Sequence, residues 1–345
     1  MTRWAVILAG GVGSRFWPLS TPSRPKQLLP LVNEKPLLVN TLDRLRDLVP
    51  ADHTLVLTNA SLVDAVTKAA PAIPRENIIA EPKPAGTAAA LAWAATVIAE
   101  RSSSDASMIC VHADWAIADD EAFRTALAGA ERVAREEQAL VTVGVVPTRP
   151  DPGFGYIEAG EVTESGARQV LRFVEKPDRK RAESMMHGGY LWNSGIFAWR
   201  VKDFLDEIRR VTPEVSKALD SDHSRSLNEF FDAVVPISVD VGVLERSNKV
   251  RVLAGDFGWD DVGTWGALRR VKTEDEGGNV TSGEVISLDA RGNVVHAEGG
   301  PVVLYGVNDL VVVTRNGMTL VTTTECSADL KRLIDSLPSH LRDLA

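Results

Sequence analysis

Short apolar runs alternate with longer amphipathic stretches through the first half of the chain. The runs predict buried strands over 4–8, 53–58, 77–80, 108–113 and 140–146. The stretches have apolar residues at helical spacing and predict helices over 37–48, 60–70, 85–100 and 121–137. This alternation is typical of an α/β fold with a doubly wound, mostly parallel sheet, Rossmann-like in outline, covered by helices on both faces.

The pattern changes twice further along. Strand-like runs at 156–162 and 169–175 and helical stretches at 178–187, 201–210 and 226–233 continue the first domain. A polar stretch that ends in glycine, 273–278, then precedes five short β-rich runs: 284–288, 293–297, 302–305, 310–314 and 319–323. Turn residues between them predict a small all-β module, such as a short β-helix or a meander, and 328–337 closes it as a helix. We therefore predict a domain over 1–273 and a small β-rich domain over 279–345.

Composition narrows the class of protein. The 345 residues are 44% apolar and 25% charged, which excludes disorder for most of the chain. No uncharged apolar run approaches the roughly 18 residues of a membrane helix, and the first run is followed at once by Gly10, so we expect a buried strand and not a secretion signal. The net charge of −9 argues against nucleic acid or acidic membranes as partners. Two cysteines, Cys110 and Cys326, cannot build a disulfide framework, so we expect a cytoplasmic protein.

The most informative segment follows the first predicted strand. It reads Leu8-Ala9-Gly10-Gly11-Val12-Gly13-Ser14-Arg15-Phe16-Trp17-Pro18-Leu19-Ser20, and Pro25-Lys26-Gln27 comes soon after. Glycines at the end of a buried strand bring backbone N–H groups against phosphate oxygens, and Arg15 and Lys26 add positive charge. A Rossmann fingerprint would need glycine at position 16, and a Walker loop would need Gly-Lys before Ser or Thr. We predict a phosphate-binding loop of another kind.

This segment closely resembles the signature of the sugar-1-phosphate nucleotidyltransferases, and within them the mannose-1-phosphate guanylyltransferase branch. The resemblance continues in order over most of the first 270 residues. Its motifs are Glu81-Pro82 with Gly86-Thr87-Ala88, Ala113-Asp114, Gly153-Phe154-Gly155-Tyr156-Ile157, Phe173-Val174-Glu175-Lys176-Pro177, Trp192-Asn193-Ser194-Gly195-Ile196-Phe197 and Trp259-Asp260-Asp261-Val262-Gly263-Thr264-Trp265. The family implies a nucleotidyltransferase fold with a short left-handed β-helix at its C-terminal end. The sequence departs from the family at Gly86, where asparagine is usual, and at His112-Ala113-Asp114-Trp115, where Pro-x-Asp-His is usual.

The implied reaction is attack of a mannose 1-phosphate oxygen on the α-phosphorus of GTP, which forms GDP-mannose and releases pyrophosphate. A phosphate monoester is largely dianionic near neutral pH, so the reaction calls for cations and backbone donors and not for a strong base. The sequence agrees, because it contains no G-x-S-x-G elbow and neither cysteine carries a protease signature.

Two carboxylates are the predicted magnesium ligands. Asp114 follows a buried strand, where open α/β sheets bind ligands, and Asp261 lies in a Trp-Asp-Asp-Val-Gly turn. The resemblance implies that both hold Mg²⁺ and that Arg15 and Lys26 are catalytic with them. Asp260 competes with Asp261 for this role, and Asp240 is a weaker candidate. The six histidines form no zinc motif.

The remaining site residues follow from the resemblance. Glu175 is assigned to sugar hydroxyls and Lys176 to the sugar phosphate, although adjacent residues of a regular strand point to opposite faces. The other predicted sugar-phosphate ligands are Gly155, Tyr156, Asn193 and Gly195. The predicted nucleotide ligands are Leu8, Ala9, Gly10, Gly11, Gly13, Ser14, Arg15, Lys26, Glu81, Pro82, Gly86, Thr87 and Asp114. Glu81 is the candidate for guanine selection, because one carboxylate can accept from guanine N1–H and N2–H₂ together.

Two alternatives stay open on the sequence alone. The chain could act on another sugar or base, as a glucose-1-phosphate thymidylyl- or uridylyltransferase or a heptose-phosphate guanylyltransferase does. It could also be a non-catalytic, nucleotide-binding regulatory homologue. The expected partners are GTP and mannose 1-phosphate, without nucleic acid or membrane, and the β-rich tail is compatible with a homodimer.

Overall fold

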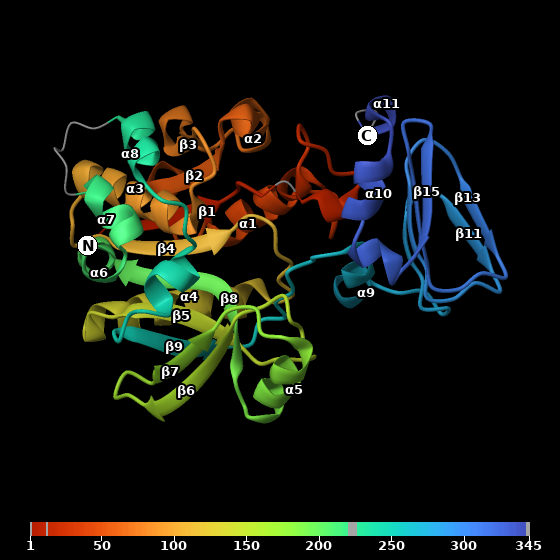
Figure 1. Cartoon of the computed structure of the whole chain (residues 1–345). Coiled ribbons are helices and arrows are strands. Elements are labelled where there is room, and N and C mark those ends of the chain that lie inside the picture. The colour runs from red at the N-terminus through yellow and green to blue at the C-terminus, as the bar shows by residue number, and fades with distance from the viewer. Residues whose placement is uncertain (1, 12, 220–225, 343–345) are drawn as a thin grey trace. The chain divides into compact units, whose positions relative to one another are not determined.

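The protein is described by a computed structural model that covers residues 2–11, 13–219 and 226–342 (Figure 1). Residue 12 of the glycine segment and residues 1 and 343–345 at the ends of the predicted domains lie outside the described residues. The chain folds into two compact units. The first unit comprises Met1–Gly10, Leu42–His112 and Asp119–Trp259, and the second comprises Gly11–Thr41, Ala113–Ala118 and Asp260–Ala345. The domain division at 273–279 stays a prediction.

The first unit is built on a nine-stranded sheet in the order β3-β2-β1-β4-β8-β5-β9-β7-β6. The strands are β1 (Arg3–Leu8), β2 (Thr54–Asn59), β3 (Ile78–Glu81), β4 (Ser107–His112), β5 (Leu140–Val145), β6 (Tyr156–Val162), β7 (Arg168–Val174), β8 (Leu191–Arg200) and β9 (Val250–Gly255). β1, β2, β3 and β4 pair in parallel, with Leu8 opposite both Leu57 and His112. Their carboxyl ends therefore meet at one edge of the sheet, the edge where open α/β sheets bind ligands.

The expected mostly parallel sheet is in fact mixed. β8 lies between β4 and β5 and runs antiparallel to both, and the β6–β7 hairpin is antiparallel as well. β6 and β7 run antiparallel because a short turn joins them, and such a turn cannot return the chain for parallel pairing. Parallel pairing outside the first block occurs between β5 and β9.

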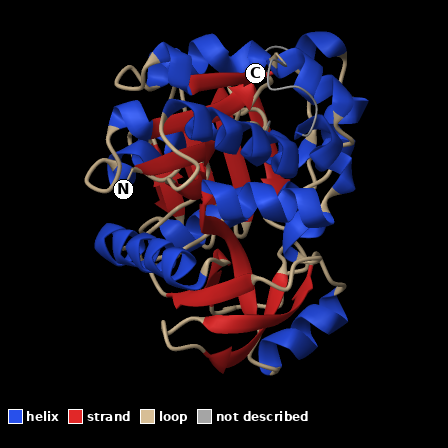
Figure 2. Ribbon diagram, turned by 90° about the vertical axis from the view of Figure 1, so that its left-hand side faces the viewer, coloured by secondary structure: helices blue, strands red, loops and turns tan. Residues whose placement is uncertain are grey.

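Helices cover the strands of this sheet, as Figure 2 shows. Their bounds are α2 (Val63–Ala69), α3 (Gly86–Arg101), α4 (Asp120–Glu137), α5 (Arg179–His187), α6 (Val201–Val211), α7 (Pro213–Leu219) and α8 (Leu227–Ala233), while α1 (Leu37–Leu45) runs from the second unit into the first. α3 packs on β1 and on α6, and its small alanines allow that close approach. α4 packs on β4, β5, β8 and β9. The helices predicted from the apolar periodicity are confirmed to within a few residues at their ends.

The second unit contains a coil of short strands. β10 (Val280–Ser282), β12 (Val294–Ala297) and β14 (Leu310–Arg315) pair in parallel, β11 (Val285–Leu288) pairs in parallel with β13 (Val302–Tyr305), and β15 (Met318–Thr323) returns antiparallel to β14. Buried asparagines link the coils, because Asn279 Oδ1 accepts from Asn293 Nδ2 at 2.8 Å and Asn293 Oδ1 accepts from Leu310 N at 2.9 Å. Parallel stacking excludes a simple meander for β10–β14. α9 (Leu268–Val271), α10 (Lys331–Ser336) and α11 (Ser339–Arg342) complete the unit, and the predicted closing helix is shorter than expected.

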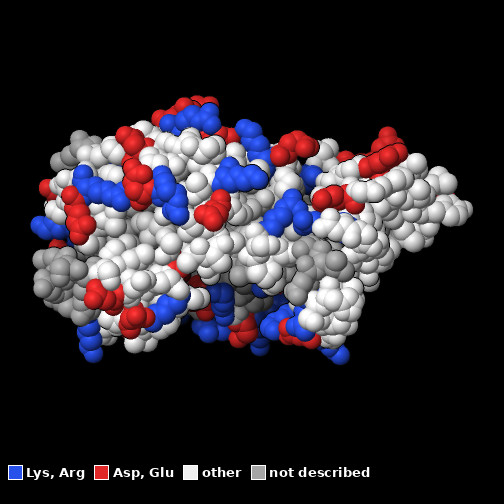
Figure 3. Space-filling view, turned by 90° about the horizontal axis from the view of Figure 1, so that it is seen from above, with Lys and Arg blue, Asp and Glu red and all other residues white. Residues whose placement is uncertain are grey.

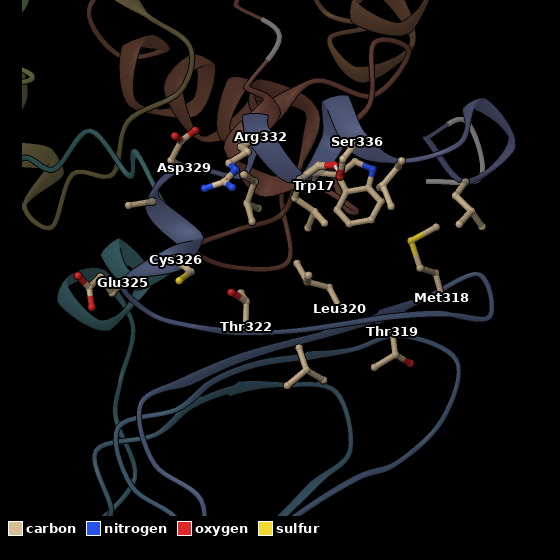
Figure 4. A pocket seen from close by; sticks show the side chains of 16 residues that line it. Trp17, Met318, Thr319, Leu320, Thr322, Glu325, Cys326, Asp329, Arg332 and Ser336 are labelled. Atoms are coloured by element: carbon tan, nitrogen blue, oxygen red, sulfur yellow. Dashed lines mark hydrogen bonds between the residues drawn. The ribbon is translucent and has the colours of Figure 1, made fainter.

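One apolar core unites the three chain segments of the second unit. Phe16, Trp17 and Leu19 from the glycine segment pack with Val262, Trp265 and Leu268, and with Val280, Val294 and Val311 of the coil. β15 and α10 also border a cavity of about 970 Å³, into which Trp17, Met318 and Leu320 project (Figure 4). The coil therefore supplies part of the core that supports the glycine segment.

Within the described residues, no helix is long and apolar enough to cross a bilayer. On the face in Figure 3, basic and acidic side chains are interspersed and form no broad patch of one sign.

Candidate active site

The glycine segment leaves β1 at the carboxyl edge of the parallel block. Leu8 and Ala9 are buried, whereas Gly10, Gly11, Ser14 and Arg15 are exposed. Ala9 N donates to Leu57 O at 2.8 Å, which extends the sheet by one bond before the chain turns. Gly13 begins a short 3-10 turn, η1 (Ser14–Phe16), with φ of 64°. A Cβ on Gly13 would lie 2.3 Å from Lys26 Cβ, so glycine is required there by both conformation and space.

Lys26, Asp114 and Asp261 meet in the second unit. The Lys26 ammonium donates to Asp114 Oδ2 at 3.0 Å and to the Asp261 carbonyl at 2.6 Å. Two reciprocal backbone bonds between Ala116 and Asp260, of 2.9 and 3.0 Å, join the segments that carry the two aspartates. The Lys26 side chain is 8% exposed, whereas those of Asp114 and Asp261 are 35% and 29% exposed. The two carboxylates are thus partly exposed to solvent, whereas the lysine is buried and held by two hydrogen bonds.

Asp260 and Asp261 have different surroundings. Asp260 is buried, accepts from both Arg270 Nε at 2.6 Å and Arg270 Nη2 at 3.0 Å, and also accepts from Val262 N at 2.8 Å. Asp261 Oδ1 lies 3.9 Å from Arg270 Nη2, beyond hydrogen-bond length. Asp260 is therefore engaged in holding the turn, and Asp261 is the more exposed of the two carboxylates. Sequence reasoning did not find Arg270, because it lies outside the motif.

In the first unit, Glu81 stands at the end of β3 beside the glycine segment. A Cβ on Gly10 would lie 3.5 Å from Glu81 Oε1, so the two residues are neighbours. Burial raises the pKa of the Glu81 carboxyl to about 7. Pro82 is exposed next to it. A half-buried carboxyl with this pKa, at the carboxyl edge of the sheet, is suited to accept hydrogen bonds from a ligand.

The start of α3 explains the departure at Gly86. Gly86 has φ of 80°, and a Cβ there would lie 2.2 Å from the Ile237 carbonyl oxygen. The next residue, Thr87, accepts from Val239 N at 2.9 Å through its hydroxyl. Asparagine tolerates positive φ but not this contact, so in this chain the position requires glycine. Both residues fasten α3 to the segment that leads to Asp240.

Gly155, Glu175 and Lys176 also meet in the first unit. A Cβ on Gly155 would lie 2.7 Å from Glu175 Oε2, which makes glycine necessary for this approach. β7 ends at Val174, and Lys176 adopts φ of 48°. The expectation that Glu175 and Lys176 point apart holds only for a regular strand. In the structure Lys176 Nζ donates to Glu175 Oε1 at 2.5 Å.

Asn193 connects this group to Asp240. Asn193 N donates to Gly155 O at 2.8 Å, and Asn193 Nδ2 donates to Asp240 Oδ1 at 2.8 Å. The Asn193 carbonyl oxygen accepts from Thr142 Oγ1 at 3.0 Å and from Gly195 N at 3.3 Å, which fixes the orientation of the amide. Burial and then the Glu175 charge raise the pKa of Asp240 to about 6. Sequence reasoning treated Asp240 only as a weaker metal candidate, since 47 residues separate it from Asn193.

The structure thus gathers the predicted residues into three groups: Gly13, Lys26, Asp114 and Asp261; Gly10 and Glu81; and Gly155, Glu175, Lys176 and Asn193. Arg15 stands apart from them, with no hydrogen bond or ion pair to any described residue. Tyr156 is buried, and its hydroxyl is bonded to the backbone of Asp151. Gly195 has φ of 75° at an irregularity of the β5–β8 pairing.

Oxygen ligands at the first group suit a divalent metal. Asp114 and Asp261 offer two accessible carboxylates, and hard cations such as Mg²⁺ bind one or two carboxylates together with substrate phosphates. No cluster of three or more His, Cys, Asp or Glu able to hold a metal occurs among the described residues. The donor set therefore fits a metal shared with phosphate oxygens and does not fit an all-protein cage.

The first unit has a mixed sheet with Glu81 and the start of the glycine segment at its carboxyl edge, and the second unit joins Lys26 to Asp114 and Asp261. The chain belongs to the nucleotidyl transferase family, whose model matches residues 4–277. A second model, the MannoseP isomerase/GMP-like beta-helix domain, matches residues 283–337. Divalent metals are generally used in this family.

The relatives are more specific. The chain is 36% identical to mannose-1-phosphate guanylyltransferase ManC of Salmonella typhimurium, over 98% of this chain and 74% of the relative. It is also 36% identical to mannose-1-phosphate guanylyltransferase of Escherichia coli K12, with the same shares covered. A solved structure described as mannose-1-phosphate geranyltransferase from Thermus thermophilus matches with a TM-score of 0.91 and 36% identity, over 97% of this chain and 99% of that one.

Proposed function

We propose that this chain transfers GMP from GTP to α-D-mannose 1-phosphate and forms GDP-mannose and pyrophosphate. The observation that carries the proposal is the Lys26–Asp114–Asp261 group, retained in a chain that is 36% identical to mannose-1-phosphate guanylyltransferases over 98% of its length. A protein that only binds nucleotide would not need this arrangement. The proposal therefore covers the sugar (mannose), the base (guanine) and the pathway step (GDP-mannose synthesis).

The chain's own contribution is positioning and charge. The sugar phosphate is already a nucleophile, so the barrier lies in bringing two anions together and in stabilising the charge that spreads over the α-phosphorus. Lys26 would hold its ammonium near the reacting phosphate, because two acceptors fix it at 3.0 and 2.6 Å. Arg15 and the N–H groups of the glycine segment would bind the pyrophosphate end of GTP.

Asp114 and Asp261 would hold Mg²⁺, the divalent metal we propose for this chain. When bound, the ion neutralises phosphate charge and orients the phosphates. Lys26, bonded to the Asp114 carboxylate and to the Asp261 backbone carbonyl, would keep the two residues next to each other. Arg270 would hold Asp260, so that the turn presents Asp261.

The group in the first unit would bind the sugar. The Glu175 carboxylate and the Asn193 amide would form hydrogen bonds with hydroxyl groups of the sugar. Gly155, which has no side chain, would let the sugar ring approach the backbone closely. Lys176, whose side chain is 66% exposed, would bind the sugar phosphate. Glu81 would accept from guanine N1–H and N2–H₂, with the Gly86 backbone nearby on α3. Tyr156, Pro82 and Thr87 would support these residues in place.

The same proposal includes the remaining expectations from the sequence and from the resemblance. These are a doubly wound arrangement of the sheet, a left-handed coil in the C-terminal module, a cytoplasmic location, a homodimer and the absence of nucleic acid from the partners.

A substrate panel tests the proposal. Pyrophosphate release is measured for the purified chain with four nucleoside triphosphates, each combined with mannose, glucose and heptose 1-phosphates. We expect the highest kcat/KM for GTP with mannose 1-phosphate. A preference for another pair would replace the substrate assignment, and release from no pair would favour a regulatory homologue. Asp114→Asn serves as the inactive control.

A further inference from the structure

A second group of cations lies in the second unit, apart from the residues assigned above. We call Arg24, Lys272, His296 and Arg315 the basic cluster. Arg24 ends a tight turn that is closed by two backbone bonds with Thr21, each 3.1 Å long. Arg315 ends β14 and donates from Nη1 to Leu19 O at 2.7 Å, so it reaches the same turn. His296 lies on β12, and Lys272 directly follows α9.

Within the described chain, the cluster has more donors than acceptors. Glu298 lies 3.8 Å from Arg315 Nε and 3.6 Å from His296 Nε2, too far for hydrogen bonds of ordinary length. Arg315 Nε is buried without a hydrogen-bond partner, and the half-buried Arg24 guanidinium has neither a hydrogen bond nor an ion pair with any described residue. Lys272 Nζ donates at 2.7 Å to Ser282 Oγ, which carries no charge.

The cations also repel one another. Burial, and then the Arg315 charge, lowers the pKa of Arg24, while the Glu298 charge raises it. Burial lowers the pKa of Lys272, against the effect of Glu34. Burial also lowers the pKa of His296, where Lys272 and Arg24 act in the same direction and Glu298 opposes them. Glu298 and Glu34 are thus the carboxylates that face Arg24, Arg315 and Lys272. A bound anion would reduce the repulsion between these three cations.

We propose that the basic cluster binds the phosphoryl group of a small molecule. Two guanidinium groups with unused N–H donors provide the forked geometry that phosphate oxygens prefer, and Lys272 adds a point charge. Arg24 stands two residues before Lys26, so a bound anion would restrain the turn that leads to the catalytic lysine. The inference does not depend on the proposed function, because it concerns binding and not turnover.

Calorimetric titration with orthophosphate tests the site. The background variant Arg15→Gln/Lys26→Gln/Lys176→Gln removes the cationic side chains assigned to the reaction, so phosphate bound by this protein reports on other sites. We expect one equivalent per chain, and an affinity about tenfold weaker when Arg24→Gln is added. Arg332→Gln, which removes an exposed arginine of α10, is the matched control and leaves the affinity unchanged. Equal affinity with and without Arg24→Gln, or no binding at all, would overturn the proposal.

Thermal unfolding gives an independent readout in the same background variant. Arg24→Gln breaks no hydrogen bond to a described residue and relieves repulsion, so at low salt it should raise Tm. Phosphate should raise the Tm of Arg332→Gln and leave that of Arg24→Gln nearly unchanged. Repeating the titration with a hexose 6-phosphate separates free phosphate from the phosphoryl group of a larger metabolite: tighter binding identifies the metabolite as ligand, and weaker binding identifies orthophosphate. Arg315→Lys keeps the positive charge but loses the forked guanidinium donors, so it should lower the affinity for either ligand.

Discussion

The adjacent side chains of Asp260 and Asp261 have different surroundings. Asp260 is enclosed by the Arg270 fork and by Val262 N, whereas Asp261, one residue later, is 29% exposed. Asp260 therefore holds the turn, and the metal-binding role that we propose falls to the more exposed Asp261. The sequence favoured Asp261 from its place before Val262-Gly263, but the fork that occupies Asp260 depends on a residue ten positions away.

The first prediction uses this contrast. Asp114→Asn and Asp261→Asn should each nearly abolish turnover with little change in Tm, because a shared metal supplies several kcal/mol of transition-state stabilisation. Asp260→Asn should instead lower the free energy of unfolding by about 1–3 kcal/mol, since it weakens a charged hydrogen-bond group. Steady-state pyrophosphate release and denaturant unfolding measure the two effects. Near-normal turnover of both Asp114→Asn and Asp261→Asn at saturating Mg²⁺ would contradict the metal assignment.

The second prediction concerns Glu81, whose pKa is raised to about 7. Guanine donors bind the ionised carboxylate, so KM for GTP should rise as the pH falls below 7 and the carboxyl becomes protonated. Glu81→Gln should lower kcat/KM for GTP by about tenfold, change ATP and UTP far less, and remove this pH dependence of KM. Kinetics between pH 6 and 8 test all three effects.

Stability provides the control for Glu81. When the pKa of a carboxyl is higher in the folded than in the unfolded protein, the free energy of unfolding falls as the pH rises from about 4.5 through 7. Glu81→Gln should therefore raise Tm at pH 8 more than at pH 5. An unchanged GTP-to-ATP preference together with this Tm effect would mean that Glu81 is buried for other reasons.

The third prediction separates the cations. Lys176→Ala should raise KM for mannose 1-phosphate more than KM for GTP, because we assign Lys176 to the sugar phosphate. Arg15→Ala should raise KM for GTP more, since we assign it to the pyrophosphate end. Both KM values are measured in both variants, and identical patterns would show that the two roles are wrongly divided.

At the scale of elements, continuous apolar runs were the predictable part. β1, β2 and β4 are buried on both faces and read as unbroken apolar segments, and α3 and α4 follow helical periodicity. β8 was missed, because Asn193, Ser194 and Gly195 interrupt its apolar pattern. Ser194 satisfies its hydroxyl on Val143 O at 2.6 Å inside the sheet, a long-range contact that no local pattern encodes. The sequence motifs name the candidate site residues, whose roles stay predictions, but the grouping of these residues depends on such contacts.

The fourth prediction concerns the start of α3. Gly86→Asn restores the residue usual in the family, yet its Cβ would lie 2.2 Å from Ile237 O, which belongs to rigid backbone. The overpacking should cost about 1–3 kcal/mol of the free energy of unfolding and shift the start of the helix. Denaturant unfolding measures the loss. Gly166→Asn, at a positive φ with no atom within 4 Å of the added Cβ, is the matched control and should cost much less.

At the scale of the whole molecule, the second unit draws on three separate parts of the chain. Lys26, Asp114 and Asp261 come from one part each, and their shared core includes strands of the C-terminal coil. A local reading of the sequence places these motifs in the first predicted domain. It cannot foresee that the coil completes the core beneath them.

The fifth prediction follows from that core. A chain that ends at residue 278 keeps every residue assigned to the reaction but loses Val280, Val294 and Val311 from the core. It should lose nearly all turnover, and the 11–41 segment should become sensitive to limited proteolysis. A truncated protein with full activity and the wild-type digestion pattern would show that the coil serves another purpose, such as dimerisation.

Because the second unit is built from distant chain segments, it can be completed only late in synthesis. Residues 11–41 leave the ribosome early, but their packing partners from residue 260 onward emerge on the order of ten to forty seconds later, at about 5–20 residues per second. Until then Phe16, Trp17 and Leu19 lack the apolar surface that buries them in the finished protein. The nascent chain can therefore assemble the sheet of the first unit before the apolar residues of the glycine segment are buried. We therefore expect a prematurely terminated chain, which lacks the C-terminal part of this core, to be inactive.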